Sequence, residues 1–523
     1  MRFALSQEPP MIRLLLIAIL LVLPVSVQAE ELTEYDVSLF AFDDQSIPWK
    51  SNLKLTMTPP KKHPDNPLIP IGEKGACDEG GVQFYGSMIK HEGKYKLWYV
   101  ALDDAVFKRA YAGLRVAYAE SDDGIHWTKP NLGLVEYRGN TNNNLVAVDP
   151  PEACTIHMIV LHEADEPDPT RRFKMMMNVQ TRLAERKQNV ATSVAFFSAD
   201  GLRWRAATKM EFENGQIKDE YRTLPPVHFE QGGLFRWKGM YHLTGQQITP
   251  WVYQADGKVT GRVMTTYRSP DLIDWQEAPA FGFMRGTAIG IPGKPSEDEE
   301  AHLPSSVWHR NNVLLGVYGI WRGAPEWKDR IIDLGLNISN DGIHFREPIR
   351  DYVLIKAGQA GEWDVGGLLQ GQGFAHVGDE TYLYYGAWDL TVAPKFPPRG
   401  GVGVVTMRRD GFGYLSRIDE SAAAVFDTTT IHPQQNGVRL IANIDQAHVG
   451  TPPLVELIDE RGKPIAGYSG KNAARLNRNG TRQPIIWPAT NSPDIATAEP
   501  FSIRVTLAND SSAHIYALYV DQK

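Results

Sequence analysis

A short turn sequence, Ser121-Asp122-Asp123-Gly124-Ile125-His126-Trp127, decides the fold because it recurs along the chain. The later copies are Ser198-Ala199-Asp200-Gly201-Leu202-Arg203-Trp204, Ser269-Pro270-Asp271-Leu272-Ile273-Asp274-Trp275, Ser339-Asn340-Asp341-Gly342-Ile343-His344-Phe345 and a degenerate Arg409-Asp410-Gly411-Phe412-Gly413-Tyr414. Successive aspartates are 77, 71, 70 and 69 residues apart, and an aromatic residue follows each by four positions. A repeat with this long period indicates an architecture built from repeated units.

Two β-rich runs precede every copy of the turn. The nearer runs cover residues 114–119, 193–197, 263–267, 334–338 and 402–407, and the earlier, more aromatic runs cover 95–99, 173–177, 241–243, 314–318 and 382–385. Each repeat therefore predicts a four-stranded sheet whose third and fourth strands are joined by the Asp-Gly turn. We expect the aspartate to cap backbone N–H groups of the turn and the aromatic residue to pack between neighbouring sheets.

Five such sheets can bury their apolar faces against one another if they close into a ring. The sequence thus predicts an all-β chain, with a five-bladed β-propeller over residues 30–418. After a Ser/Ala-rich link at 421–424, residues 454–458, 501–507 and 513–520 read as strands between turn sequences. We expect residues 419–523 to form a small C-terminal β-sandwich.

The first 29 residues have the features of a targeting signal. Arg2 and Arg13 precede an apolar run over residues 14–23, and Val27-Gln28-Ala29 offers small residues for cleavage. This run is shorter than the roughly 20 residues that a membrane-spanning helix needs, and no later run is long enough. We expect a cleaved signal peptide and a secreted or periplasmic protein; an uncleaved N-terminal anchor is the alternative.

Composition limits the classes of partner. Without the first 29 residues the chain has 52 Lys and Arg against 61 Asp and Glu, and this mild acidity argues against nucleic acid or an anionic membrane. Cys77 and Cys154 are compatible with one disulfide or with two buried thiols. No Cys/His cluster has the spacing of a zinc site, so we expect no metal and no other cofactor. The oligomeric state is left open.

Five repeats with Ser-x-Asp-Gly-x-x-Trp turns, followed by a sandwich, resemble the propeller glycoside hydrolases of families 32 and 43 and their unassigned relatives. Residues 455–459, 464–469 and 515–519 are similar to the sandwich of family 32, and the resemblance spans residues 64–523. It implies a funnel with three carboxylates at the starts of the innermost strands of the first three blades. Cleavage needs a pair, because one carboxyl protonates the leaving oxygen while another attacks or activates water.

Blade three fits this pattern best. Glu230 stands in Val227-His228-Phe229-Glu230-Gln231-Gly232-Gly233 and lies eleven residues before Tyr241, the same interval that separates the first-blade Asp of family 32 from its Tyr. The resemblance therefore implies that Glu230 opens the innermost strand and acts as the proton donor. The alternative is a solvated carboxylate at a strand end.

Blades one and two depart from the pattern. The position in blade one that corresponds to Glu230 is Phe84, so Asp78 and Glu79 are the nearest candidates for nucleophile or base. Blade two lacks the Arg-Asp pair of family 32, and Glu152 or Asp149 is its candidate helper. The fructose-cleaving activity of family 32 is therefore not implied for this chain.

Further polar and aromatic residues are expected on the rim where the innermost strands begin. Aromatic rings there would stack on sugar rings, while arginine and carboxylates would bind hydroxyl groups. We expect substrate contacts from Asp149, His302, Trp321, Arg322, Asp364 and Trp388; for any single one, a structural role is the alternative. Other rim candidates are Asp103, Asp104, Trp251, Glu299, Glu300, Trp327, Glu362, Trp363 and Asp389.

The sequence as a whole favours a glycoside hydrolase that acts on an oligo- or polysaccharide with paired carboxylates in the funnel. A non-catalytic glycan-binding propeller is an alternative, because the first-blade motif is missing. A glycoside phosphorylase is another, and it would need basic residues in the funnel. No Gly-x-Ser-x-Gly elbow is present, which disfavours a Ser/His/Asp enzyme. The sugar, the linkage and the stereochemistry stay open.

Overall fold

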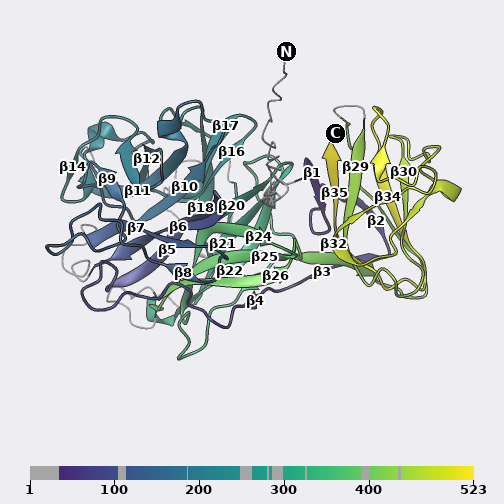
Figure 1. Ribbon diagram of the computed structural model, residues 1–523, viewed down its shortest axis with the longest axis horizontal. Helices are drawn as coiled ribbons and strands as arrows, with labels where there is room; N and C mark the ends of the chain where they lie inside the picture. The colour runs from purple at the N-terminus through teal and green to yellow at the C-terminus, as the bar shows by residue number, and fades with distance from the viewer. Residues whose placement is uncertain are drawn as a thin grey trace, which may run out of the picture. The chain divides into compact units, whose positions relative to one another are not determined.

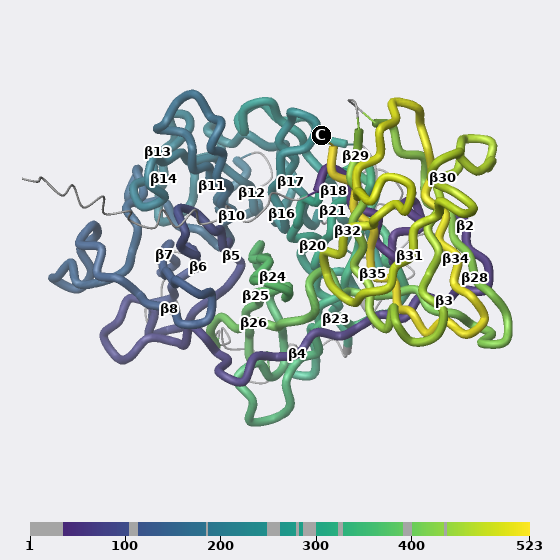
Figure 2. The backbone as a smooth tube through the Cα atoms, turned by 45° about the vertical axis from the view of Figure 1, so that its right-hand side comes forward, coloured from purple at the N-terminus to yellow at the C-terminus, as the bar shows by residue number. Residues whose placement is uncertain are grey.

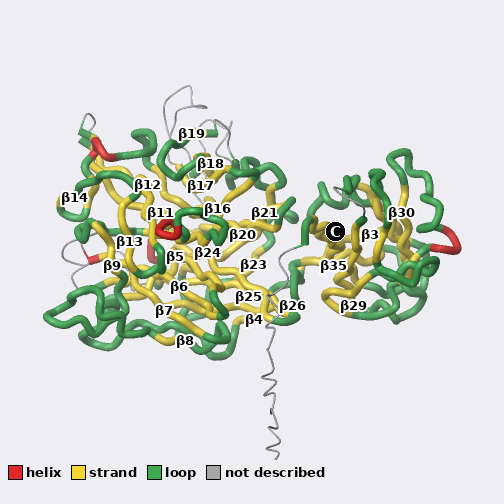
Figure 3. The backbone as a smooth tube through the Cα atoms, turned by 45° about the horizontal axis from the view of Figure 1, so that its top comes forward, coloured by secondary structure: helices red, strands yellow, loops and turns green. Residues whose placement is uncertain are grey.

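The computed structural model describes residues 35–103, 113–184, 187–247, 262–278, 282–285, 299–323, 327–390, 400–433 and 437–522. Nearly all regular structure in them is strand (Figure 3), and the helices are single 3₁₀ turns at Pro169–Arg171, Asp219–Tyr221, Trp327–Asp329 and Gly470–Asn472. No helix in these ranges could cross a membrane. The predicted signal peptide lies outside the described residues.

Five consecutive groups of antiparallel strands cover the repeat region and confirm the predicted all-β, propeller-type fold. Blade one consists of β5 (Gly81–His91), β6 (Lys94–Leu102), β7 (Leu114–Ser121) and β8 (Trp127–Thr128), and blade two of β10 (His157–His162), β11 (Phe173–Leu183), β12 (Gln188–Ser198) and β13 (Arg203–Ala206). Blade three consists of β16 (Phe229–Trp237), β17 (Met240–Gln247), β18 (Val263–Ser269) and β19 (Gln276–Glu277), and blade four of β20 (Glu299–Arg310), β21 (Val313–Gly323), β22 (Arg330–Ser339) and β23 (Val353–Ile355). Blade five consists of β24 (Gly367–Val377), β25 (Glu380–Trp388) and β26 (Gly401–Arg408). Blade two carries three further short strands, β9 (Ala147–Asp149), β14 (Phe212–Glu213) and β15 (Gln216–Ile217).

The repeated turns join the third and fourth strands as predicted. In the first copy, Asp123 Oδ1 accepts hydrogen bonds of 2.8 Å from the N–H groups of Ile125 and His126, and Asp200, Asp271 and Asp341 accept the equivalent pairs. The side chain thus satisfies backbone donors that the tight turn leaves without a strand partner. The four aspartates therefore stabilise the turns in which they lie.

Each turn also contacts the neighbouring blade. Trp98 of blade one donates its indole N–H to the Gly201 carbonyl of blade two at 2.7 Å, and a Cβ on Gly201 would lie 2.7 Å from the Trp98 ring. Gly201 has φ +76°, so both its conformation and this contact favour glycine. Tyr384 of blade five reaches the Gly124 carbonyl of blade one at 2.7 Å. Blades five and one are therefore adjacent, as ring closure requires.

The outer strand of blade five comes from the N-terminal part of the chain. β4 (Lys61–Lys62) pairs with β26 through Lys62 and Val405, although these residues are far apart in sequence. A strand from before blade one thus completes the last sheet, which stabilises the closed ring and shortens its exposed edge.

The C-terminal domain is a two-sheet sandwich, and it includes strands from the start of the chain. One sheet contains β1 (Val37–Phe40), β3 (Leu53–Met57), β27 (Gly413–Arg417), β29 (Val438–Asp445), β32 (Gly480–Pro484), β33 (Asp494–Ile495) and β35 (His514–Gln522); the other contains β2 (Trp49–Ser51), β28 (Ala424–Asp427), β30 (Leu454–Ile458), β31 (Ala474–Arg475) and β34 (Ser502–Leu507). Figures 1 and 2 show the purple N-terminal strands among the yellow C-terminal ones.

The pairing of β1, β2 and β3 with C-terminal strands changes the domain organisation. The sequence places residues 30–418 in the propeller and 419–523 in the sandwich, whereas residues 37–57 and 413–417 pair within the sandwich sheets. The short N-terminal runs lack the repeat sequence, and only long-range pairing assigns them to a sheet. The sandwich therefore consists of segments from both ends of the chain.

The degenerate fifth turn has a different role from the other four. Asp410 is buried, and its carboxylate accepts hydrogen bonds from both Arg310 of β20 and Tyr519 of the sandwich, at 3.0 and 2.7 Å for the Oδ2 contacts. His376 of β24 lies 3.0 Å from Oδ1. This carboxylate therefore connects blades four and five to the C-terminal domain.

Candidate active site

The innermost strands of all five blades line one narrow cavity. Its walls are Tyr85 and Gly86 of β5, His157 and Ile159 of β10, Gln231 and Gly232 of β16, Leu303 of β20, and Gln370 and Gln372 of β24. Several of these glutamines join blades: Gln231 donates to the Met176 carbonyl at 2.7 Å, and Gln372 to the Leu234 carbonyl at 2.7 Å. The cavity thus marks the propeller axis, and the side chains at the strand starts surround its mouth.

Glu230 lies at the start of β16, next to Gln231, which lines the cavity. It is the second residue of β16, and its side chain is 23% exposed, so solvent and a ligand can reach it. Its carboxylate accepts a hydrogen bond from Gln246, the residue paired with it on β17, and lies 3.5 Å from His228 Nε2. β16 therefore presents a carboxylate that is held by its neighbours.

The surroundings of Glu230 favour its ionised form. Burial would raise the pKa of the Glu230 carboxyl, but the hydrogen bond and charge of His228, together with the charges of His157 and Arg262, lower this pKa below its ordinary value. A proton donor in glycoside cleavage needs a raised pKa. A lowered pKa therefore suits a base or nucleophile better than the proton donor that the resemblance implies.

Arg262 connects Glu230 to a second carboxylate. Its guanidinium lies 3.2 Å from Glu300 of β20 and donates to the Gln246 amide oxygen at 3.4 Å, while the amide nitrogen of Gln246 binds Glu230. Glu300 is 26% exposed, close to the value for Glu230. Carboxylates from blades three and four are thus linked through one amide and one guanidinium.

An aromatic group lies beside these carboxylates. The ring of Trp321, on β21, lies 4.4 Å from the Arg262 guanidinium carbon and 4.8 Å from that of Arg330. His302 packs edge-on against Trp321 at 5.0 Å and against Trp388 at 6.1 Å. The structure therefore brings together three of the residues predicted to contact substrate.

Tyr85 and His157 extend this group to blades one and two. The Tyr85 hydroxyl is 3.4 Å from His302 Nδ1, and its ring lies 4.3 Å from His157. Both residues are buried and face the axial cavity. The mouth thus combines side chains from the innermost strands of blades one to four, and both carboxylates come from blades three and four.

Asp78 has a different environment. It is 1% exposed and accepts hydrogen bonds from Tyr99 at 2.7 Å and from Lys129 at 2.6 Å. Glu79 pairs at 2.5 Å with Arg138, which lies in the segment that follows β8. Neither carboxylate has a hydrogen bond or ion pair with Glu230 among the contacts of the described residues, so the structure does not join the two candidates to the Glu230 group.

The same arrangement occurs in blade five. The sequence Gly-x-x-Gly-x-x-Asp-x-Gly-Gly is found at 72–81 and at 358–367. Asp364 accepts from Tyr385 at 2.9 Å and pairs with Lys62 at 2.6 Å, as Asp78 does with Tyr99 and Lys129. In both blades the tyrosine lies on the second strand, and the lysine lies on the outer strand or just beyond it. Two equivalent ion pairs indicate a structural role for Asp78 and Asp364.

The candidates of blade two lie away from its innermost strand. Asp149 ends β9, where it pairs with Arg205 of the outer strand β13, and Glu152 is exposed in the following turn. The innermost strand begins only at His157. The polar segment 149–154 precedes this strand, so neither carboxylate lies at the start of the innermost strand.

The other rim candidates are accounted for as follows. Arg322 pairs with Asp333 at 2.8 Å, Glu362 accepts from the Gln359 N–H at 2.7 Å, the Asp103 N–H donates to the Gly113 carbonyl, and Trp363 packs against Tyr385. Asp104 and Trp251 lie outside the described residues, as do the side chains of Glu299 and Trp327. Asp389 follows β25 directly.

Cys77 and Cys154 do not form a disulfide, which was one of the two possibilities that the sequence left open. The buried Cys77 thiol lies 3.3 Å from Asn144 Oδ1, and burial raises its pKa to about 12. Such a thiol stays protonated and unreactive at neutral pH. No group of three or more His, Cys, Asp or Glu side chains with the arrangement of a metal site occurs among the described residues.

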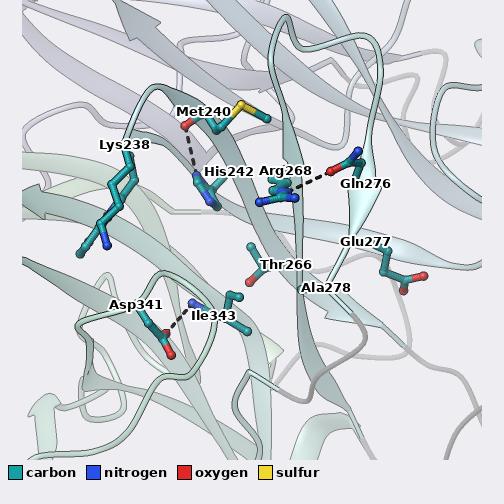
Figure 4. A pocket seen from close by; sticks show the side chains of 11 residues that line it. Lys238, Met240, His242, Thr266, Arg268, Gln276, Glu277, Ala278, Asp341 and Ile343 are labelled. Carbon is teal, nitrogen blue, oxygen red and sulfur yellow. Dashed lines mark hydrogen bonds between the residues drawn. The ribbon is translucent and has the colours of Figure 1, made fainter.

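A second cavity, of about 400 Å³, lies between blades three and four on the face that carries the Asp-Gly turns (Figure 4). Its carboxylates already have structural partners: Asp341 caps its own turn and Glu277 accepts from Tyr267 at 3.2 Å. This cavity therefore lacks a pair of available carboxylates, and the mouth around Glu230 is the better candidate.

His228, Gln246, Arg262 and His157 were missed by sequence reasoning. His228 is two residues from Glu230 and His157 begins an innermost strand, so position in the repeat could have indicated both. Gln246 and Arg262 face Glu230 only through strand pairing and side-chain packing. No local sequence signal marks them.

Comparison with known proteins gave no matching family model and no matching curated protein. Among solved structures, the chain is similar to a glycosyl hydrolase from Bacteroides ovatus, with 14% identity over 67% of this chain and 94% of that one and a TM-score of 0.41. It is also similar to a structure from the GH130 family of mannoside phosphorylases, with 14% identity, 66% and 93% coverage and a TM-score of 0.39. A Bombyx mori GH32 beta-fructofuranosidase shows 10% identity, 88% and 95% coverage and a TM-score of 0.38. At these values the likenesses assign no reaction.

Proposed function

We propose that this chain is a glycoside hydrolase that cleaves an oligo- or polysaccharide at the propeller mouth. The observation that carries the proposal is the link between Glu230 and Glu300 through Gln246 and Arg262. Two partly exposed carboxylates from neighbouring blades, next to a tryptophan and histidines, provide the groups that glycosidic cleavage requires.

The two carboxylates take different roles in this proposal. Glu230, whose pKa is lowered, is the base or nucleophile on one side of the sugar ring. Glu300 is the second carboxylate of the pair that the reaction needs, and Arg262 holds it in place. His302, Trp321 and Trp388 bind the sugar next to the cleaved bond, because aromatic rings pack against the C–H faces of sugars.

The test is product release from a panel of purified polysaccharides. We expect wild-type protein to release reducing sugars from at least one of them. Glu230→Gln keeps the hydrogen bond to Gln246 but removes the negative charge, so turnover should fall by about a thousandfold or more. Asp78→Asn is the matched control, and it should lower stability while a folded fraction keeps its turnover. Full activity in Glu230→Gln would overturn the assignment.

A non-catalytic glycan-binding propeller is the second candidate function. The observation that favours it is that Asp78 and Glu79, the blade-one carboxylates, both form ion pairs with basic residues of the segment that follows β8. Calorimetric titration with the same glycans separates the two candidates. Binding without any released product over days would support this second function.

A phosphorylase is tested in the same assay. The guanidinium groups of Arg262 and Arg330 both lie against the Trp321 ring, where they could bind phosphate as well as a carboxylate. Turnover that requires inorganic phosphate and yields a sugar phosphate would assign that reaction instead of hydrolysis.

A further inference from the structure

The outer face of one sandwich sheet carries a row of side chains in strand register. Trp49 of β2 is directly opposite Asp427 of β28, Asp427 is opposite Arg504 of β34, and Arg504 is opposite Glu456 of β30. Residues directly opposite each other in antiparallel strands share one face of the sheet. These four side chains, which we call the sandwich row, therefore lie side by side across four strands.

Alternating burial shows that the sandwich row faces outward. Phe426, Val505 and Val455, which are adjacent in sequence to members of the row, are 0–1% exposed and belong to the domain core. Asp427, Arg504 and Glu456 are half-buried, and Trp49 is 70% exposed. Since successive side chains point to opposite faces, the row lies on the outer surface.

The Trp49 side chain is far more exposed to solvent than is usual for a large apolar side chain. It is the largest of the exposed apolar side chains, and β2 is the edge strand of its sheet. A tryptophan left in water at a sheet edge is a typical contact residue for a flat ligand, because its large ring offers contact area with few rotatable bonds.

The polar members of the row are held in fixed positions. Arg504 binds both carboxylate oxygens of Asp427, each at 2.7 Å, and Glu456 accepts from the Gly470 N–H at 2.8 Å. Such a row offers both donors and acceptors on side chains that hydrogen bonds already hold, which lowers the entropic cost of binding a ligand. The carboxylates keep unused lone pairs that can accept hydroxyl hydrogens.

We propose that the sandwich row is a carbohydrate-binding surface for a neutral glycan chain, separate from the propeller mouth. A sugar ring would stack on Trp49, and the hydroxyl groups of the following sugars would bind Asp427, Arg504 and Glu456. Three strand intervals of about 4.8 Å give the row a length of roughly 14 Å, which suits a short stretch of extended glycan. Arg504 compensates Asp427, and Glu456 leaves the row with one net negative charge, so a neutral chain fits it better than an anionic one.

This inference does not depend on catalysis in the propeller. Its test therefore uses the full chain carrying Glu230→Gln, so that the glycan is not consumed. Migration is compared in native gels that contain xylan, mannan, mixed-linkage β-glucan or inulin. We expect retardation by at least one of them, with a dissociation constant about tenfold or more higher when Trp49→Ala is added.

Two matched variants define the controls. Trp49→Phe keeps an aromatic ring and should retain most of the binding, whereas Ile486→Ala removes an exposed apolar side chain that follows a strand of the other sheet and should change nothing. Retardation that is unaffected by Trp49→Ala, or absent with all four polysaccharides, would overturn the inference. A dimer in sedimentation velocity that Trp49→Ala dissociates would also overturn it, by assigning the edge to a second copy.

Discussion

Arg262 is the residue on which the charge balance of the propeller mouth depends. It lies beside Glu300, holds the Gln246 amide that binds Glu230, and contributes to the lowered pKa of the Glu230 carboxyl. One positive group thus acts on both proposed catalytic carboxylates. Removal of the Arg262 guanidinium should therefore change the pH dependence of the reaction more than it changes the stability of the fold.

With a glycan that the protein cleaves, we expect Arg262→Gln to shift the acid limb of kcat/KM to higher pH. The lowered pKa keeps Glu230 ionised as the pH falls. Without the positive charge of Arg262 this pKa rises, so Glu230 becomes protonated at a higher pH. The shift should be up to about one pH unit. Lys94→Gln, which removes an exposed lysine of blade one, serves as the control. An unchanged acid limb would mean that Glu230 is not the group that titrates.

At the scale of the element, the Asp-Gly turn is one sequence with two structural uses. In four copies the aspartate caps its own turn, and in the fifth Asp410 binds Arg310 and Tyr519 across the boundary with the sandwich. Burial separates the two uses, since the Asp200 side chain is 42% exposed and that of Asp410 is fully buried.

For a capping copy, Asp200→Ala should lower the free energy of unfolding by about 1–2 kcal/mol. The change removes the acceptor for the Leu202 and Arg203 N–H groups, which is equivalent to the loss of a helix cap. Urea denaturation followed by fluorescence measures it. Asp122→Ala, at an exposed position of the same kind of turn, should stay within about 0.5 kcal/mol of wild type. Equal effects of both variants would contradict the capping role.

For the fifth copy, Asp410→Ala should cost about 3–5 kcal/mol, because it leaves the buried Arg310 guanidinium without its carboxylate. Thermal and urea denaturation would both report it. A double variant, Asp410→Leu with Arg310→Met, should recover part of the loss, since no charge is then left buried. A loss no larger than that of Asp200→Ala would show that Asp410 is only another turn residue.

Most of the propeller strands could be predicted because the repeat sets their phase. The runs at 95–99, 114–119 and 402–407 all lie within observed strands, and 454–458 in the sandwich matches β30. The innermost strands of blades one and two were harder to place. Their polar approach loops, around Asp78 and Asp149, resemble strand starts in composition, and only the pairing register shows where the strands begin.

The candidate site could be predicted only in part for the same physical reason. Glu230, His302, Trp321 and Trp388 follow from position within the repeat. The role of Glu230 depends on Gln246, Arg262 and Glu300, whose closeness results from packing between blades three and four. The structural role of Asp78 became recognisable only by comparison with Asp364, because each carboxylate binds one tyrosine and one lysine.

At the scale of the whole molecule, the two ends of the chain fold together. β1, β2 and β3 belong to the sandwich, and β4 then completes blade five. The core around Phe40, Phe412 and Tyr519 also includes residues of blades four and five. The two domains are therefore joined by a shared core and by two chain connections, one between β3 and β4 and one between β26 and β27.

A fragment of residues 419–523 should not fold by itself. It lacks β1, β3 and β27 of one sheet and β2 of the other, so its core side chains would be left in water. Near-UV circular dichroism and proteolysis would show an unstructured fragment, while a fusion of residues 35–57 to 413–523 should recover structure. A stable, cooperatively unfolding 419–523 fragment would contradict this organisation.

The central claim is that Glu230 and Glu300 act on a glycosidic bond at the propeller mouth. The most direct test is a crystal structure of the Glu230→Gln variant with an oligosaccharide that the wild-type protein cleaves. We predict that the glycosidic oxygen lies between the side chain at position 230 and Glu300, with a sugar ring against Trp321 or Trp388. A productive oligosaccharide bound in the cavity near Arg268 and Glu277, with an empty mouth, would contradict the claim.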